Sequence, residues 1–158
     1  MRLVVQRVAR AAVRVGDRTV AEIGPGLLIL VGVGHDSIPE EVYGLASKAA
    51  NLRIFEDDRG KMNRSLLEVG GEALVVPQFT LYGDTRRGRR PSWAAAAPPD
   101  VAADLVERFV GELEAAGVTV RRGAFQEHMQ VELVNDGPVT ILLEGPSKME
   151  LRKRFAWE

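Results

Sequence analysis

The chain of 158 residues is 46% hydrophobic, which is enough to bury the core of one domain. It contains no cysteine, which excludes a disulfide framework, a thiolate metal site and a cysteine nucleophile, and makes the cytoplasm the expected compartment. The formal net charge of −1 leaves only a local basic patch for any contact with nucleic acid. No apolar stretch approaches the ~20 residues that cross a bilayer, so we expect no membrane-spanning segment.

The N-terminal half reads as strands joined by tight turns and followed by a helix. Strands are predicted at residues 3–8, 11–15 and 19–23. Residues 27–33 form a continuous apolar run, which is typical of a strand buried on both faces. Asp36 or Ser37 is expected to cap a helix that runs to about Arg53.

The C-terminal half combines a second helix with further strands. A polar loop at residues 56–63 and an undecided segment at 65–71 come first. The second helix opens at Pro98 and stops at Gly117. Strands are predicted at residues 72–76, 118–121, 129–134 and 139–143. Because hairpin turns join the early strands, we predict one α+β domain at residues 1–145, with a curved, mostly antiparallel, barrel-like sheet and two main helices packed on it.

Two short strings interrupt the apolar strands. They are Pro77-Gln78-Phe79-Thr80-Leu81 and Asn135-Asp136-Gly137-Pro138-Val139-Thr140. Each places small or polar residues where a strand ends or breaks, which is where sites on a sheet scaffold usually lie. Thr80 carries the hydroxyl that is best placed for catalysis, but no base stands beside it in the sequence, and an unactivated hydroxyl is a poor nucleophile. Gln78 either holds a substrate group or ties down a loop.

Other common catalytic and cofactor sites find little support. The two histidines, His35 and His128, come without a nucleophile-elbow pattern and without a helical histidine pair, which argues against both a serine triad and a zinc site. Gly32-Val33-Gly34 lacks the third glycine of a nucleotide-binding turn. We therefore expect neither a metal nor a cofactor.

A basic cluster is the candidate contact with RNA. It consists of Arg86, Arg87, Arg89 and Arg90, with Trp93 close behind. Arginines bind phosphate with two parallel hydrogen bonds and aromatic rings stack on bases. A solvated loop is the alternative interpretation of the same residues.

The two strings make the chain resemble the D-aminoacyl-tRNA deacylases, which remove D-amino acids wrongly esterified to tRNA. The signatures of that family are a Ser-Gln-Phe-Thr-Leu motif and an Asn-any-Gly-Pro-Val-Thr motif. Residues 135–140 match the second at every fixed position, and residues 77–81 depart from the first only at Pro77. The resemblance runs from Met1 to about Glu144, through residues 3–8, 24–33, 53–55, 60–63 and 129–131.

The resemblance implies hydrolysis of the ester bond of D-aminoacyl-tRNA by a homodimer whose active site lies at the subunit interface. Gln78, Phe79 and Thr80 would be the catalytic residues that line the aminoacyl pocket. Gly137-Pro138 would be cis, would enter the partner's pocket and would reject L-aminoacyl-tRNA, with Arg7 holding that loop. The chemistry would use backbone groups and the terminal 2′-hydroxyl of the tRNA. Glycyl-tRNA mischarged on tRNA(Ala) would be a side substrate.

Several alternatives stay open at this point. A sister group of achiral tRNA deacylases also has proline at the position of Pro77, but it has alanine in place of Phe79 and tyrosine in place of Val139. A non-catalytic tRNA-binding module and a purely structural dimer are two further readings. Residues 146–158 are expected to form a C-terminal extension that is helical, disordered or in contact with RNA.

Overall fold

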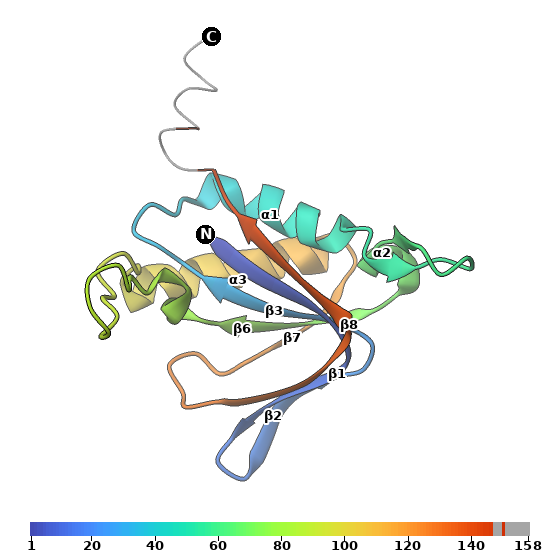
Figure 1. Ribbon diagram of the computed structural model, residues 1–158, viewed down its shortest axis with the longest axis horizontal. Helices are drawn as coiled ribbons and strands as arrows, with labels where there is room; N and C mark the ends of the chain where they lie inside the picture. Colours follow the sequence, from blue (N-terminus) through green and yellow to red (C-terminus); the bar gives the residue numbers. More distant parts are fainter. Residues whose placement is uncertain (147–149, 151–158) are drawn as a thin grey trace.

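Strand β1 (Arg2–Val15) organises the sheet because three other strands pair with it. The computed structural model describes residues 1–146 and residue 150. In it, β1 is antiparallel to β2 (Arg18–Ile23), to β3 (Gly26–Gly32) and to β8 (Gln130–Glu144). The first half of β1 pairs with β3 and the second half with β2, so the sheet curves around this strand (Figure 1).

The sheet continues beyond β3 with parallel pairings. Strand β6 (Glu72–Pro77) lies parallel to β3, and β7 (Thr119–Arg122) lies parallel to β6. The prediction of one α+β domain with a curved, barrel-like sheet and two main helices is confirmed. The sheet is mixed, however, because helices form the crossovers from β3 to β6 and from β6 to β7, and such crossovers permit parallel strands.

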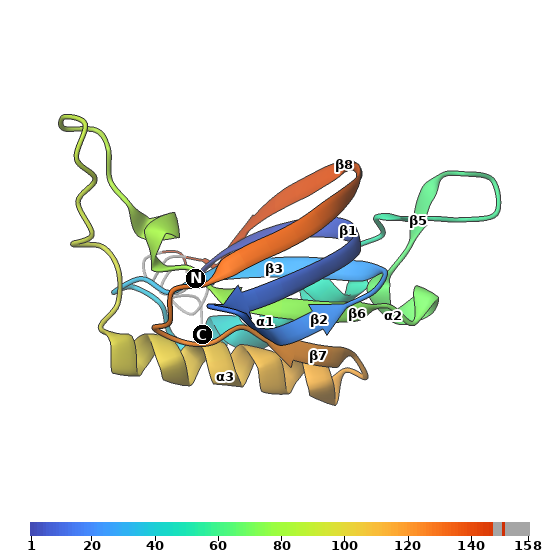
Figure 2. The same cartoon turned by 90° about the horizontal axis from the view of Figure 1, so that it is seen from below.

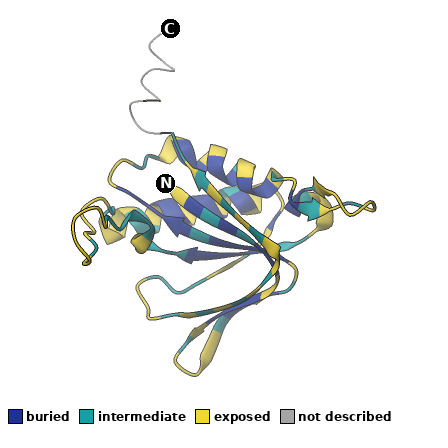
Figure 3. Ribbon diagram, in the orientation of Figure 1, coloured by how far each residue is buried: buried dark blue, intermediate teal, exposed yellow. Residues whose placement is uncertain are grey.

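Two helices cover one face of this sheet, as Figures 1 and 2 show. They are α1 (Pro39–Asn51) and α3 (Pro99–Ala115). Their buried faces turn toward the sheet and their exposed faces turn outward (Figure 3). A hydrophobic core packs between these helices and the sheet, and Phe109 and Ala46 are among its fully buried residues. A second apolar cluster that includes Val13 and Leu74 lies apart from this core.

Several element boundaries differ from the sequence-based prediction. The predicted strands at 3–8 and 11–15 form one strand, as do those at 129–134 and 139–143. The polar loop at 56–63 carries short strands at both ends, β4 (Phe55–Glu56) and β5 (Met62–Arg64). The undecided segment contains a single helical turn, α2 (Leu66–Val69).

Helix α1 begins one or two residues later than predicted. Its N-cap is Ile38 rather than Asp36 or Ser37. Pro39 follows Ile38 and confines it to extended backbone, observed at φ −132° and ψ 152°, so the helix starts at the proline. The Ser37 hydroxyl instead accepts a hydrogen bond from the Gly34 N–H at 3.0 Å.

A buried ion pair fixes the start of β1 against α1. The α-ammonium group of Met1 lies 2.5 Å from Glu41 Oε1, and both groups are almost completely buried. The N–H of Gly145 donates to the Met1 carbonyl at 2.9 Å, which joins the end of β8 to the same point. Apart from Pro146 and Glu150, the predicted extension at 146–158 lies outside the described residues. In the described part of the chain, no helix is long and apolar enough to cross a membrane.

Candidate active site

The first string forms a tight turn at the end of β6. Residues Phe79–Tyr82 make a 3-10 turn, η1, directly after Pro77 and Gln78. The Gln78 N–H donates to the Val31 carbonyl on β3 at 2.8 Å, which fixes where the turn begins. A Cβ on Gly34 would lie only 2.3 Å from the Tyr82 ring, so this glycine allows the turn to pack closely on the sheet.

The side chains of η1 are open to solvent and lack a base. Phe79 is 57% exposed and meets Trp93 edge-on, with ring centroids 5.2 Å apart. Among the described residues, the hydrogen bond to the Thr80 hydroxyl comes from the Gln78 side-chain amide. An amide cannot take a proton from the hydroxyl, so the geometry gives Thr80 no activation as a nucleophile.

The second string forms an exposed bend in the middle of β8. The Gly137-Pro138 peptide bond is cis. Gly137 has φ +155°, and a Cβ there would lie 2.7 Å from the Val139 nitrogen, so only glycine fits. The Asn135 side chain closes the bend, since its Oδ1 accepts from the Val139 N–H at 2.7 Å and its Nδ2 donates to the Val139 carbonyl at 3.1 Å. Asn135 was not among the predicted site residues, although it is the first residue of the Asn-any-Gly-Pro-Val-Thr motif and could have been predicted from it.

Arg7 holds this bend from β1. Its Nε donates to the Asp136 carbonyl at 2.7 Å, and Nη1 donates to the Ile54 carbonyl at 2.7 Å. The β1–β8 register shifts on either side of Val8, and a bulge of this kind re-aims the side chains around it. Arg7 is only 7% exposed, so its charge is stabilised by carbonyl groups rather than by water.

The structure keeps the two strings apart within one chain. Gln78 is hydrogen-bonded to Val31, which pairs with Leu3 on β1, whereas Arg7 holds the bend four residues further along β1. Four strand residues span about 13 Å. Figures 1 and 2 both show the turn after β6 and the bend of β8 at different ends of the sheet.

The arginine cluster lies on a loop that projects beyond the sheet. Asp84 and Ser92 exchange backbone hydrogen bonds of 2.8 and 2.9 Å, which close the loop at its base. The Arg86 guanidinium donates to both oxygens of Asp84, at 2.9 and 2.7 Å, and lowers the pKa of that carboxyl to about 2. The three other arginines are exposed and make no ion pair among the described residues; they are Arg87, Arg89 and Arg90.

Comparison with known proteins places this architecture in a family. The family model for D-Tyr-tRNA(Tyr) deacylase matches residues 4–144. The chain is 60% identical over 154 residues to the D-aminoacyl-tRNA deacylase of Roseiflexus castenholzii, covering 98% of each protein. It is 58% identical over 145 residues to the enzyme of that name from Thermotoga petrophila, covering 92% of this chain and 97% of the relative. This chain belongs to the D-aminoacyl-tRNA deacylase family.

Two solved structures share the fold of this chain. The chain superposes on the c-Myc DNA unwinding element binding protein with a TM-score of 0.88 and 37% identity, covering 93% of this chain and all of that chain. It shares its fold with a probable eukaryotic D-amino acid tRNA deacylase, at a TM-score of 0.76 and 21% identity. The deacylase is accordingly a hydrolase of ester bonds, which confirms the expected class of reaction.

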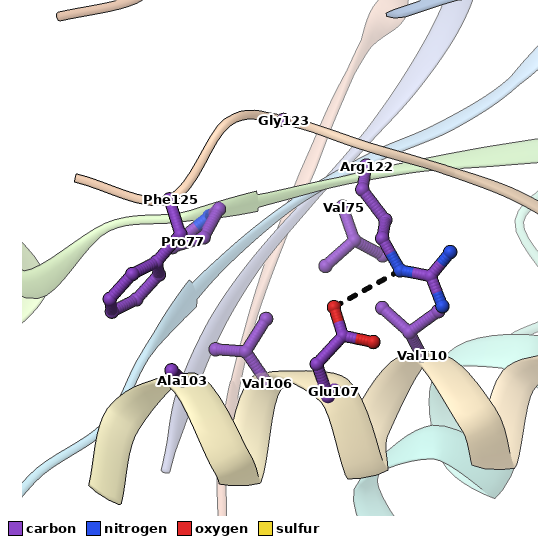
Figure 4. Close-up of a pocket in the computed structure, with 9 residues that line it drawn as sticks. All are labelled: Val75, Pro77, Ala103, Val106, Glu107, Val110, Arg122, Gly123 and Phe125. Carbon is purple, nitrogen blue, oxygen red and sulfur yellow. Dashed lines mark ion pairs between the residues drawn. The ribbon is translucent and has the colours of Figure 1, made fainter. Parts of the chain in front are cut away.

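A small pocket borders the turn. It measures about 90 Å³ and lies between β6, β7 and α3, with Pro77 and Phe125 at one end (Figure 4). The ion pair between Arg122 Nε and Glu107 Oε1, at 3.1 Å, lies at the other end. Phe79 and Thr80 lie outside this pocket, on a surface that is open to solvent.

The departure at Pro77 is accommodated without strain in the sheet. Pro77 is the last residue of β6 and lies beyond the last β6–β7 pair, which joins Val75 to Arg122. Proline cannot donate a ladder hydrogen bond, and the end of a strand is where that loss is tolerated. Pro77 therefore fits the end of β6, and the chain lacks the hydroxyl that serine provides in the family motif. Among the described residues, no group of three or more His, Cys, Asp or Glu side chains lies together as metal ligands would.

Proposed function

We propose that this deacylase hydrolyses D-aminoacyl-tRNA in the cytoplasm, releasing the free D-amino acid and tRNA. Two relatives that are 60% identical over nearly the whole chain are named D-aminoacyl-tRNA deacylases, which supports this substrate. The observation that carries the proposal is the pair of fixed but separate motifs, one on η1 and one on the bend of β8. Hydrogen bonds hold each motif in place, and each is open to solvent where substrate would bind.

The active protein is a homodimer in which each site combines η1 of one subunit with the β8 bend of its partner. Within one chain the two motifs are about 13 Å apart along β1, too far to enclose one ester group. Gly137 and Pro138 are exposed and Arg7 holds them in place from behind, so the bend is presented outward. A two-fold dimer buries the same surface on both subunits and can form two such sites at once.

Hydrolysis uses backbone groups of η1 rather than a nucleophilic side chain. The N–H groups of Phe79 and Thr80 open the turn, and the first N–H groups of a helical turn have no acceptor within it. Two such donors can stabilise the oxyanion that forms when water attacks the ester carbonyl. The Gln78 amide orients the Thr80 hydroxyl, and the 2′-hydroxyl of the terminal adenosine of tRNA assists the attack.

Selectivity for the D-form arises at the β8 bend. The backbone of Gly137 and Pro138 receives the amino group of the substrate and leaves no space for an L side chain. Exclusion by backbone atoms can discriminate more strongly than the ~1–3 kcal/mol that one methylene of fit provides. Glycine has no side chain to exclude, so glycyl-tRNA mischarged on tRNA(Ala) is a side substrate.

The exposed arginines of the loop between Asp84 and Ser92 contact tRNA phosphates. Arg87, Arg89 and Arg90 are available for this contact, whereas Arg86 is engaged by Asp84. The contact raises affinity for the whole class of tRNA rather than for one sequence, because phosphates carry no sequence information.

The test compares hydrolysis of D-tyrosyl-tRNA and L-tyrosyl-tRNA by the purified protein, with glycyl-tRNA as a third substrate. We expect rapid release of D-tyrosine, measurable release of glycine, and L-tyrosyl-tRNA left intact. Similar rates on the D- and L-esters would contradict the chiral filter, and cleavage of glycyl-tRNA alone would indicate an achiral deacylase. Binding of tRNA without hydrolysis of any ester would show that the protein is a non-catalytic tRNA-binding module.

A further inference from the structure

Arg2 makes three contacts, two with the turn η1 and one with the end of β8. Its Nη1 donates to the carbonyl of Leu81, within the turn, at 2.9 Å. Its guanidinium carbon lies 4.5 Å from the centre of the Tyr82 ring. Its Nε lies 3.1 Å from Glu144 Oε1 at the end of β8. A residue that is half open to solvent thus joins β1, β8 and the turn.

The Tyr82 ring is enclosed between this guanidinium and the sheet. Gly34 lies against the ring, where no side chain would fit, and Arg2 stacks over it. Burial raises the pKa of Tyr82, while a hydrogen bond with Ser37 acts in the opposite direction. The C-terminal part of η1 is thereby anchored, so the direction of the Phe79 and Thr80 N–H groups depends on this anchor.

We propose that Arg2 is a positioning residue for the deacylation reaction, acting through Leu81 and Tyr82 on the backbone donors of η1. The inference rests on the proposed function, in which those donors stabilise the oxyanion. Arg2 and Arg7 belong to the same strand but hold different motifs. In the proposed dimer, each active site is therefore shaped by Arg2 of the subunit that supplies η1 and by Arg7 of the subunit that supplies the β8 bend.

The chemistry requires arginine at this position. A planar guanidinium can stack on a ring and donate to a carbonyl at the same time, whereas an ammonium is a point charge on a flexible stem. Arg2→Lys should keep the hydrogen bond to Leu81 and lose part of the stacking. Arg2→Met should keep much of the packing of the stem and lose both polar contacts.

The chain offers a matched control on the same strand. Arg14 of β1 pairs with Glu132 of β8 at 3.4 Å, and its side chain is 48% exposed compared with 45% for Arg2. Arg14 lies at the end of β1 remote from η1. Arg14→Met therefore removes a similar exposed ion pair between the same two strands without touching the turn.

The experiment measures kcat and KM on D-tyrosyl-tRNA, the ratio of D to L hydrolysis, and the thermal midpoint of the four proteins. A misplaced catalytic group can cost about 10- to 100-fold in rate, so we expect a fall of this size in kcat for Arg2→Met, with KM within about twofold. Arg2→Lys should recover part of the loss, and Arg14→Met should behave as wild type. The D-to-L ratio should stay high in all of them, because the β8 bend is intact.

A second readout does not require turnover. Backbone amide hydrogen exchange at residues 79–83 should accelerate in Arg2→Met and stay unchanged in Arg14→Met. If kcat and this exchange are the same in the two variants, the assignment of Arg2 is overturned. If wild type is inactive on every ester but exchange responds as expected, the proposed function fails while the anchoring of η1 by Arg2 stands.

Discussion

The two halves of the proposed site are held in place by different means. The start of the turn η1 is fixed by backbone contacts, namely the hydrogen bond from Gln78 to Val31, the 3-10 turn itself and close packing on Gly34, and Arg2 holds the end of the turn at Leu81 and Tyr82. The bend of β8 depends on side chains, because Arg7 and Asn135 supply the contacts that set its shape. The turn should therefore tolerate substitution of its own side chains, whereas the bend, which two side chains hold, can be released by a single change.

The largest effect is expected from Arg7→Ala. Hydrogen bonds of a charged group contribute about 1.5–3 kcal/mol each, and Arg7 makes two of them, one to the buried Ile54 carbonyl, so we expect a loss of about 3–5 kcal/mol of unfolding free energy. Loosening of the bend should also permit hydrolysis of L-tyrosyl-tRNA. Urea denaturation and paired D and L assays measure the two effects.

Arg10→Ala is the control for this variant, because Arg10 is an exposed arginine of the same strand. It should change stability by less than about 0.5 kcal/mol and leave the D-to-L ratio unchanged. If Arg7→Ala keeps the wild-type ratio, Arg7 does not hold the selective element.

A smaller effect is expected from Asn135→Ala, which removes the side-chain hydrogen bonds to Val139 across the bend. Loss of neutral hydrogen bonds at a partly exposed site should cost about 1–2 kcal/mol, with weaker leakage of the L-substrate than in Arg7→Ala. Asn135→Asp keeps the acceptor for the Val139 N–H and removes the donors, so it should fall between wild type and alanine. If the alanine and aspartate variants hydrolyse L-tyrosyl-tRNA at the same rate, the acceptor oxygen at residue 135 does not contribute to selectivity.

Replacing Arg87, Arg89 and Arg90 together by alanine should raise KM and leave kcat largely unchanged. Each lost phosphate contact should reduce the log–log salt dependence of tRNA binding by about 0.7–0.9. Arg86→Ala alone should do less, since Asp84 already engages that guanidinium. If the salt dependence of tRNA binding is unchanged in the triple variant, the loop is a solvated surface that does not contact tRNA.

The smallest effect is expected from Thr80→Ala. If backbone N–H groups perform the reaction, loss of this hydroxyl should lower kcat by no more than about threefold, which corresponds to less than 1 kcal/mol. Removal of the 2′-hydroxyl from the terminal adenosine of the substrate should cost more. Mass spectrometry of the quenched reaction should find no acyl group on Thr80, and a trapped acyl-threonine would contradict this assignment.

Sequence alone predicted the local features of this fold better than its long-range pairings. The helices α1 and α3 followed from helical spacing of apolar residues, and the apolar run at 27–33 followed from burial on both faces. The parallel pairing of β3, β6 and β7 could not be derived, because it depends on which distant strands the helices bring together. The single strand β1 was divided in two because a bulge near Val8 disturbs its alternation.

The candidate site was likewise predicted in its local features but not in its long-range arrangement. The strings around Gln78 and Gly137 stand out because they place turn residues at the ends or breaks of apolar strands. Their separation depends on the register of β1 with β3 and β8, which no local pattern reveals. The pairing of Arg86 with Asp84 was likewise missed, because charge counting treats all four arginines of the cluster as equivalent.

The most direct test of the composite site uses a heterodimer of two variants, isolated through two different affinity tags. One subunit carries Arg7→Ala, and the other carries Thr80→Trp, which blocks its own turn with a bulky ring. The single open turn then belongs to the Arg7→Ala subunit, and in the proposed dimer it receives the intact bend of its partner.

We predict that this heterodimer hydrolyses D-tyrosyl-tRNA at about half the wild-type rate, since one of two equivalent sites is open. It should also reject L-tyrosyl-tRNA as wild type does. Hydrolysis of the L-substrate at about half the rate of the Arg7→Ala homodimer, which has two open turns, would show that each turn is served by the bend of its own chain, and would contradict the account.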